Sequence, residues 1–185
     1  TMIGALLTSL VMAREYERGT LESLFVTPVG SGEILTAKAA TNFLLGMVSL
    51  AISMIFAAFV FDIPIRGSLI LLLAVSALFL IVALGLGLVI STATKNQFLA
   101  CQFAIMGTFM PALMLSGFLY DILNMPPAVR AITYIIPARY YVTLLQTLFL
   151  AGDIPSVIIP CCITLGVFAV VLMGIARLKA PKSLE

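Results

Sequence analysis

The chain has 185 residues, of which 62% are hydrophobic and only 10% are charged, and its formal net charge is +2. An ordinary soluble domain carries roughly 25% charged residues, so this composition excludes a water-soluble globule and predicts a membrane protein. The small net charge gives no indication of a nucleic-acid partner. The chain contains no histidine, which removes the commonest metal ligand and general base, and we expect no catalytic, metal or cofactor site.

The chain opens with an apolar run, residues 1–13. As a helix rising about 1.5 Å per residue, this run covers only about 20 Å, which is too short to cross a bilayer. It has neither the charged start nor the small-residue cleavage site of a signal peptide. We interpret it as the second half of a membrane helix, so that the chain is expected to be the C-terminal part of a longer subunit.

A polar segment, 14–38, follows this run. Its charged residues are Arg14, Glu15, Glu17, Arg18, Glu22, Glu33 and Lys38. Within it, Gly19 interrupts the helical run, and Thr20 can cap a new helix with Glu22 in its first turn, where the helix dipole favours an acid. Thr27-Pro28 then ends that helix, because the residue before a proline avoids the helical region. The sequence therefore predicts a short helix over Thr20–Val26 between two membrane spans.

This short helix has an apolar side formed by Leu21, Leu24 and Phe25. A helix of this length is marginal alone in water, so a surface must hold it. One candidate surface is the layer of lipid headgroups, and the other is a cytoplasmic protein. Four acids outnumber three bases in segment 14–38, and anionic headgroups attract bases, so the charge favours a protein partner.

Long stretches without any charged residue make up most of the remaining chain. A helix needs roughly 20 apolar residues to cross the hydrocarbon core, and each of these stretches is long enough. The predicted spans are residues 39–61, 68–92, 98–119 and 154–176. The expected fold is an all-α polytopic membrane protein with four complete transmembrane helices and a partial N-terminal one.

The first complete span carries small and polar residues on one helical face, namely Asn42, Gly46, Ser49 and Ser53. Such a face allows close packing of another helix, or it lines the path of a transported molecule; both interpretations stay open. A similar face on the next span, formed by Ser76, Ala83, Gly87 and Ser91, is expected to be its mate. In the span that follows, Pro111 is expected to bend the helix.

Segment 120–153 is too apolar for a free loop and is interrupted by Pro126, Pro127 and Pro137. We predict two short helices, Pro127–Ile135 and Ala138–Leu150, that enter the outer leaflet. Arg139 should lie at the membrane boundary and reach water or pair with Asp121 or Asp153. In the last span, Cys161 and Cys162 should remain free thiols, because successive helical residues point about 100° apart.

The basic residues divide unequally between the two ends of the spans. Seven of them fall on one side and three on the other. The positive-inside rule then places segment 14–38, residues 95–96 and the C-terminus in the cytoplasm, and segment 120–153 outside.

Three motifs resemble the type-2 ABC exporter permeases. The first is the run Arg14-Glu15-Tyr16-Glu17-Arg18-Gly19-Thr20-Leu21-Glu22-Ser23-Leu24-Phe25-Val26-Thr27-Pro28. The second is Ser116-Gly117-Phe118 followed by Asn124-Met125-Pro126-Pro127, and the third is Ile136-Pro137-Ala138-Arg139-Tyr140. They occur in the order found in that family, and the resemblance covers essentially the whole chain.

The resemblance implies a multi-pass permease subunit of a bacterial-type inner membrane that exports a hydrophobic or amphipathic substrate. A separate cytoplasmic subunit would bind ATP and magnesium, and a second permease, identical or different, would complete the assembly. The implied contacts with the ATPase are Glu15, Glu17, Arg18, Gly19, Thr20, Leu21, Glu22, Leu24, Phe25, Thr27 and Pro28. The implied re-entrant segment is marked by Ser116, Gly117, Pro126, Pro127, Pro137, Arg139 and Tyr140.

Three other classes of membrane protein are alternatives to an exporter. A structural membrane scaffold fits the same composition. An ion-coupled transporter normally needs ionisable groups within its spans, and the predicted spans contain none. An intramembrane serine protease is suggested only by Ser116-Gly117, and without histidine or an intramembrane lysine that serine has no base.

Overall fold

A computed structural model describes residues 10–11, 13–14, 31–60, 67–94 and 96–179. Helices account for nearly all of these ranges, and no strand occurs within them. The long helices are α3 (Ser31–Val60), α4 (Leu69–Thr94), the interrupted helix Gln97–Leu115, and α9 (Pro155–Lys179). Among the described residues, four helices are long and apolar enough to cross a membrane. The predicted all-α membrane fold with four spans is confirmed.

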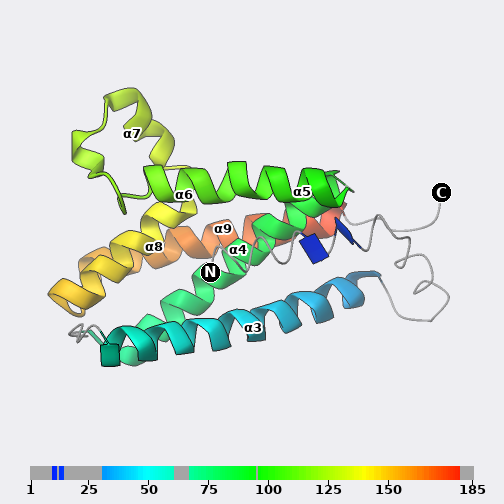
Figure 1. Cartoon of the computed structure of the whole chain (residues 1–185). Helices are drawn as coiled ribbons and strands as arrows, with labels where there is room; N and C mark the ends of the chain where they lie inside the picture. Colours follow the sequence, from blue (N-terminus) through cyan, green and yellow to red (C-terminus); the bar gives the residue numbers. More distant parts are fainter. Residues whose placement is uncertain (1–9, 12, 15–30, 61–66, 95, 180–185) are drawn as a thin grey trace.

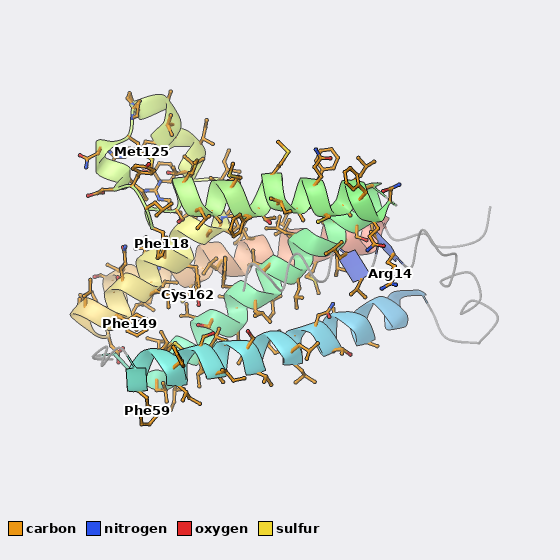
Figure 2. All side chains as sticks on the ribbon, viewed as in Figure 1. Arg14, Phe59, Phe118, Met125, Phe149 and Cys162 are labelled. Carbon is orange, nitrogen blue, oxygen red and sulfur yellow. The ribbon has the colours of Figure 1, made fainter. Side chains whose placement is uncertain are left out.

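Successive spans run in opposite directions through the bundle (Figure 1). The start of α3, the end of α4 and the end of α9 lie at one end of it, and the short helices α7 and α8 lie toward the other. Arg14 lies at the first end, whereas Phe59 and Phe149 lie at the opposite end (Figure 2). The segments predicted to share one side of the membrane therefore border the same end of the bundle.

The third span consists of α5 (Gln97–Ala104), a π-helical turn, η1 (Ile105–Phe109), and α6 (Met110–Leu115). Asn96 caps its start, since the side-chain oxygen accepts hydrogen bonds from the backbone N–H groups of Phe98 and Leu99. Pro111, which has no N–H, follows the π turn directly. The helix therefore departs from regular α-helical geometry near Pro111 as a π turn, in which the N–H of Met110 donates to the carbonyl of Ile105.

Two short helices occupy the segment between the last two spans. They are α7 (Pro127–Thr133) and α8 (Pro137–Gln146). Helix α8 continues as a π turn, η3 (Thr147–Ala151), and a 3-10 turn, η2 (Ile122–Asn124), precedes α7. Both helices begin with proline, as expected at a position whose N–H has no helical acceptor. Their depth in the membrane stays a prediction.

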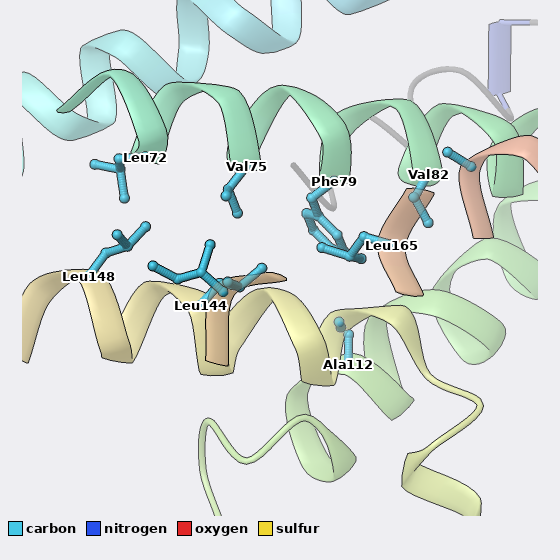
Figure 3. Close-up of a cluster of buried hydrophobic side chains, with 11 residues drawn as sticks. Leu72, Val75, Phe79, Val82, Ala112, Leu144, Leu148 and Leu165 are labelled. Carbon is cyan, nitrogen blue, oxygen red and sulfur yellow. The ribbon is translucent and has the colours of Figure 1, made fainter. Parts of the chain in front are cut away.

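Helix α4 forms the centre of the bundle, in contact with α3, α5, α8 and α9. In α4, 50% of the residues of the membrane span are buried, whereas at most 17% are buried in each of the other three spans. In Figure 3, Leu72 and Val75 of α4 point toward Leu148 of η3 and Leu144 of α8. Leu165 of α9 and Ala112 of α6 join the same core. An apolar surface on all sides of α4 is what this central position requires.

Helix α3 approaches α4 closely at Gly46. A Cβ atom built at Gly46 would lie 2.7 Å from both terminal methyl carbons of Leu80. The missing side chain therefore lets Leu80 pack directly against the backbone of α3. Small residues bring membrane helices together in this way.

We predict that Gly46→Leu destabilises the protein, because overpacking a filled contact costs about 1–3 kcal/mol. Gly174→Leu is the matched control, because a Cβ atom at Gly174 meets nothing within 4 Å. The measurement is the midpoint of thermal unfolding of the full-length permease in mild detergent. Equal midpoints for the two variants would show that Gly46 is not a packing position.

Candidate functional site

The residues predicted to contact an ATPase lie outside the described part of the structure. Only Arg14 at the start of that segment is described, and its side chain is exposed. On the other side, the chain enters α3 at Ser31. The roles of residues 15–28 therefore stay predictions.

The predicted small-residue face of α3 is divided in the structure. Gly46 packs against Leu80, whereas Ser49 and Ser53 are exposed, with the Ser53 hydroxyl donating to the carbonyl of Ser49 at 2.8 Å. Asn42 is half-buried. Gly46 is therefore a packing position. Whether Ser49 and Ser53 line a transport path stays a prediction.

The predicted mate of that face points elsewhere. Ser76 is 1% exposed and faces α8, where its hydroxyl lies 3.1 Å from the hydroxyl of Tyr141. The ring of Tyr141 stacks on Phe79 at 4.2 Å between centroids. The expectation that Ser76 pairs with α3 was wrong, because the bulky Leu80 and not a small residue of α4 fills the contact at Gly46.

The marked residues of segment 116–140 occupy the ends of helices. Ser116 and Gly117 end α6. Pro126 precedes α7, and Pro127 and Pro137 are the first residues of α7 and α8. The motif residues therefore set the points at which the chain changes direction.

Arg139 and Tyr140 connect α8 back to α7. The Arg139 guanidinium donates to the buried hydroxyl of Thr133 and lies over the ring of Tyr134, 3.9 Å from its centroid. The Tyr140 hydroxyl donates to the carbonyl of Tyr134 at 2.9 Å. The Arg139 guanidinium also lowers the pKa of the Tyr134 phenol below its ordinary value. Asp153, one of the two acids considered for Arg139, accepts a hydrogen bond from the backbone N–H of Ser68 at 2.9 Å.

An apolar cavity of about 330 Å³ lies where α4, α6, α7 and α8 meet. Phe79 and Ala83 line it from α4, and Pro111 and Ala112 line it from α6. Ile132 of α7 and Ile135 after it line the side toward α7. A cavity of this volume and apolar lining suits the hydrophobic part of a small molecule.

The three cysteines and Ser116 lie in the described part of the chain. Cys101, Cys161 and Cys162 are free thiols, as predicted for the last two. No group of three potential metal ligands occurs in the described ranges. The Ser116 hydroxyl is buried and has no hydrogen-bond partner among the described residues.

Several contacts at this end of the bundle were not predicted from the sequence. Thr133, Tyr134 and Tyr141 appeared only as members of an apolar segment, yet they bind Arg139, Tyr140 and Ser76. Spacing along the sequence gives no signal for contacts between separate helices.

The fold defines a multi-pass membrane protein, and comparison with known proteins gives its family. The family described as ABC-2 type transporter matches residues 1–150. The chain belongs to the ABC-2 type transporter family. No solved structure gives a significant match.

Three of the curated relatives are permeases of Escherichia coli strain K12. Over 185 residues the chain is 48% identical to "Probable multidrug ABC transporter permease YbhS", covering 100% of this chain and 49% of the relative. It is 32% identical to "Probable multidrug ABC transporter permease YbhR" over 154 residues, covering 81% and 41% of the two chains. It is 29% identical to "Inner membrane transport permease YhhJ" over 185 residues, covering 100% and 49%. The chain thus spans about half the length of the first of these relatives.

We predict that Ser76 and Tyr141 stabilise the fold as a pair. Ser76→Ala or Tyr141→Phe leaves the partner hydroxyl without its hydrogen bond, whereas the double variant removes both groups. The double variant should therefore be more stable than the sum of the single effects predicts. Coupling energies between polar side chains in membranes average about 0.6 kcal/mol and reach about 1.7 kcal/mol.

A double-mutant cycle on the free energy of unfolding of the full-length protein measures this coupling. Tyr140→Phe provides the control, because the Tyr140 hydroxyl bonds to a different residue, Tyr134. Ser76→Ala combined with Tyr140→Phe should be additive. Additivity in the Ser76–Tyr141 cycle as well would contradict the pair.

Proposed function

We propose that the chain is the membrane-spanning part of a permease subunit in an ATP-driven exporter that moves a hydrophobic or amphipathic molecule outward. The observation that carries this proposal is membership of the ABC-2 type transporter family together with the segment Arg14–Pro28 between two spans. Two relatives, YbhS and YbhR, are named as probable multidrug ABC transporter permeases.

In this proposal, residues 17–28 form a coupling helix that fits a groove on a separate cytoplasmic ATPase. The apolar side formed by Leu21, Leu24 and Phe25 would make the buried part of the contact, and Glu17, Arg18 and Glu22 would pair with charges on the partner. The excess of acids over bases in this segment supports a protein surface over a layer of anionic lipid.

ATP binding is assigned to the partner chain. A phosphate-binding loop of the Walker type needs a Gly-Lys pair, and this sequence contains no Gly-Lys dipeptide. ATP and magnesium would therefore be bound by the partner, and this chain would supply the path through the membrane.

A second permease and the lipid bilayer are the proposed neighbours of the exposed apolar faces. Phe98, Phe103, Met106 and Met110 on the interrupted third span are exposed. Large apolar side chains of α3 and α9, such as Ile52 and Ile163, are exposed as well. The excess of basic residues near the start of α3 and the end of α9 supports an inner-membrane orientation with the C-terminus in the cytoplasm.

The apolar cavity beside α4 and the uncharged spans support a hydrophobic or amphipathic cargo. Such surroundings favour hydrophobic or amphipathic molecules and disfavour ions. A structural scaffold remains the second candidate, because composition alone fits both. The two functions differ in whether the chain changes the activity of an ATPase.

The test is Glu22→Arg in the full-length permease, reconstituted with its ATPase. Removing one partner of a desolvated charge pair at an interface costs about 2–5 kcal/mol, so we predict loss of transport-stimulated ATP hydrolysis. Gly19→Pro should have the same effect, because it changes where the coupling helix begins. Rates of ATP hydrolysis and of transport in proteoliposomes are measured.

Three controls separate coupling from folding. Exposed charge pairs contribute about 0–1 kcal/mol to stability, so Glu17→Ala and Glu22→Ala should leave expression and the unfolding midpoint nearly unchanged. Lys182→Glu reverses a charge near the C-terminus and should leave ATPase stimulation intact. Wild-type stimulation by both Glu22→Arg and Gly19→Pro would overturn the coupling assignment and favour a helix that rests on lipid.

A further inference from the structure

The corner between α7 and α8 brings two arginines to one tyrosine. Arg139, in the first turn of α8, places its guanidinium over the ring of Tyr134, 3.9 Å from the ring centroid. Arg130 lies four residues before Tyr134 at the end of α7, so these two residues are neighbours on one side of the helical turn. The packing of the spans does not account for two positive charges at this corner.

A buried threonine holds the corner in place. The Thr133 hydroxyl donates to the carbonyl of Arg130 at 2.8 Å and accepts a hydrogen bond from the guanidinium of Arg139. The Thr133 side chain is 0% exposed. Next to Arg139, the hydroxyl of Tyr140 donates to the carbonyl of Tyr134 at 2.9 Å. A guanidinium carries five N–H donors, so the bond to Thr133 leaves donors of Arg139 for a further acceptor.

Both guanidinium groups act on the phenol of Tyr134. That of Arg139 and, less strongly, that of Arg130 lower the pKa of the phenol below its ordinary value, and no carboxylate of the described residues contributes to this shift. Asp153, an acid of the same segment, accepts a hydrogen bond from the backbone N–H of Ser68 beyond the other end of α8. Two like charges close together repel each other, and a bound anion would offset that repulsion.

The surroundings of the two arginines are those of a membrane surface. Helix α7 projects away from the long helices (Figure 1). Arg130 is exposed, and so are the apolar side chains of Ile132 and Ile135 and the ring of Tyr134. Arginine beside exposed isoleucine and tyrosine is typical of segments that lie between the lipid headgroups and the hydrocarbon. The anion available at that depth is the phosphate of a lipid.

We propose that Arg130 and Arg139 bind the phosphate of a phospholipid with a net negative headgroup, while its acyl chains lie against Ile132 and Ile135. The planar guanidinium matches a phosphate through two parallel N–H donors, and two guanidinium groups together favour a lipid with a net negative charge. The site does not depend on the proposed export function, because this lipid belongs to the membrane and is not the cargo.

The test uses the full-length permease in a neutral detergent, without the ATPase. Dioleoylphosphatidylglycerol is the probe. Dioleoylphosphatidylcholine is its control, because it has the same acyl chains and a phosphate but no net charge. Native mass spectrometry counts the lipid molecules that the protein retains at each lipid concentration, and we expect phosphatidylglycerol to be retained in preference to phosphatidylcholine. In a second arm, inorganic phosphate at the concentration of the lipid should leave the retention of phosphatidylglycerol unchanged.

Arg130→Gln and Arg139→Gln should each weaken the binding of phosphatidylglycerol about tenfold, as expected for loss of a hydrogen bond to a charged group. Arg66→Gln is the matched control, because it removes the same charge before α4, where the next residue, Gly67, bonds to Leu148 at the other end of α8. It should bind like the wild type. Because Arg130 is exposed, the test does not depend on the folding of Arg139→Gln.

Preference for phosphatidylglycerol that is lost in Arg130→Gln and kept in Arg66→Gln would support the site. Equal retention of the two lipids by the wild type would overturn the proposal, as would wild-type retention by Arg130→Gln. An equal loss in Arg66→Gln would indicate a general attraction between basic residues and anionic lipid, and displacement by inorganic phosphate would indicate a site for the free anion; either result overturns the proposal. Because no ATPase is present, failure of coupling at residues 17–28 would leave this measurement unchanged.

Discussion

Hydrocarbon offers a peptide group no hydrogen-bond partner, and this constraint decides where the chain can depart from a regular helix. Before Pro111, the chain forms a π turn, and the hydroxyl of Thr108 donates to the carbonyl of Ala104. At the start of α4, the N–H of Gly67 donates to the carbonyl of Leu148 at 2.9 Å, and that of Ser68 to Asp153 at 2.9 Å. Each break is therefore satisfied within the chain.

These hydrogen bonds also fix the positions of the helices relative to one another. The bonds from Gly67 and Ser68 tie the beginning of α4 to the junction of α8 and α9, far away in the sequence. With its start fixed there, α4 passes through the centre of the bundle and contacts the helices on each side. The apolar cavity forms where the middle of α4 meets α6 and the α7–α8 turn.

The sequence was sufficient for the family, the four spans and the two short helices of segment 120–153, because length, charge and proline position are local properties. The sequence did not show which helices lie side by side. A membrane helix such as α4 is apolar on every side, so periodicity does not tell which face meets which helix. The pairing of Ser76 with Tyr141 depends on that missing information.

The proposed function requires that an event at residues 17–28 reach the apolar cavity beside α4. Helix α3 follows that segment directly, and Ala39 packs with Leu88 of α4 and Ala176 of α9. Farther along, Gly46 lies against Leu80 of α4. At both contacts small residues bring helices close together, so no long side chain of α3 is available there to absorb a displacement.

Helix α4 then connects this packing to the apolar cavity. Phe79 of α4 lines that cavity and stacks on Tyr141 of α8. A continuous series of contacts alone does not amount to energetic coupling, which requires an element with two alternative arrangements. The π turn at Ile105–Phe109 is the described element closest to that requirement, because it borders the apolar cavity through Gly107 and Thr108, and its hydrogen-bond register differs from that of the helices on either side.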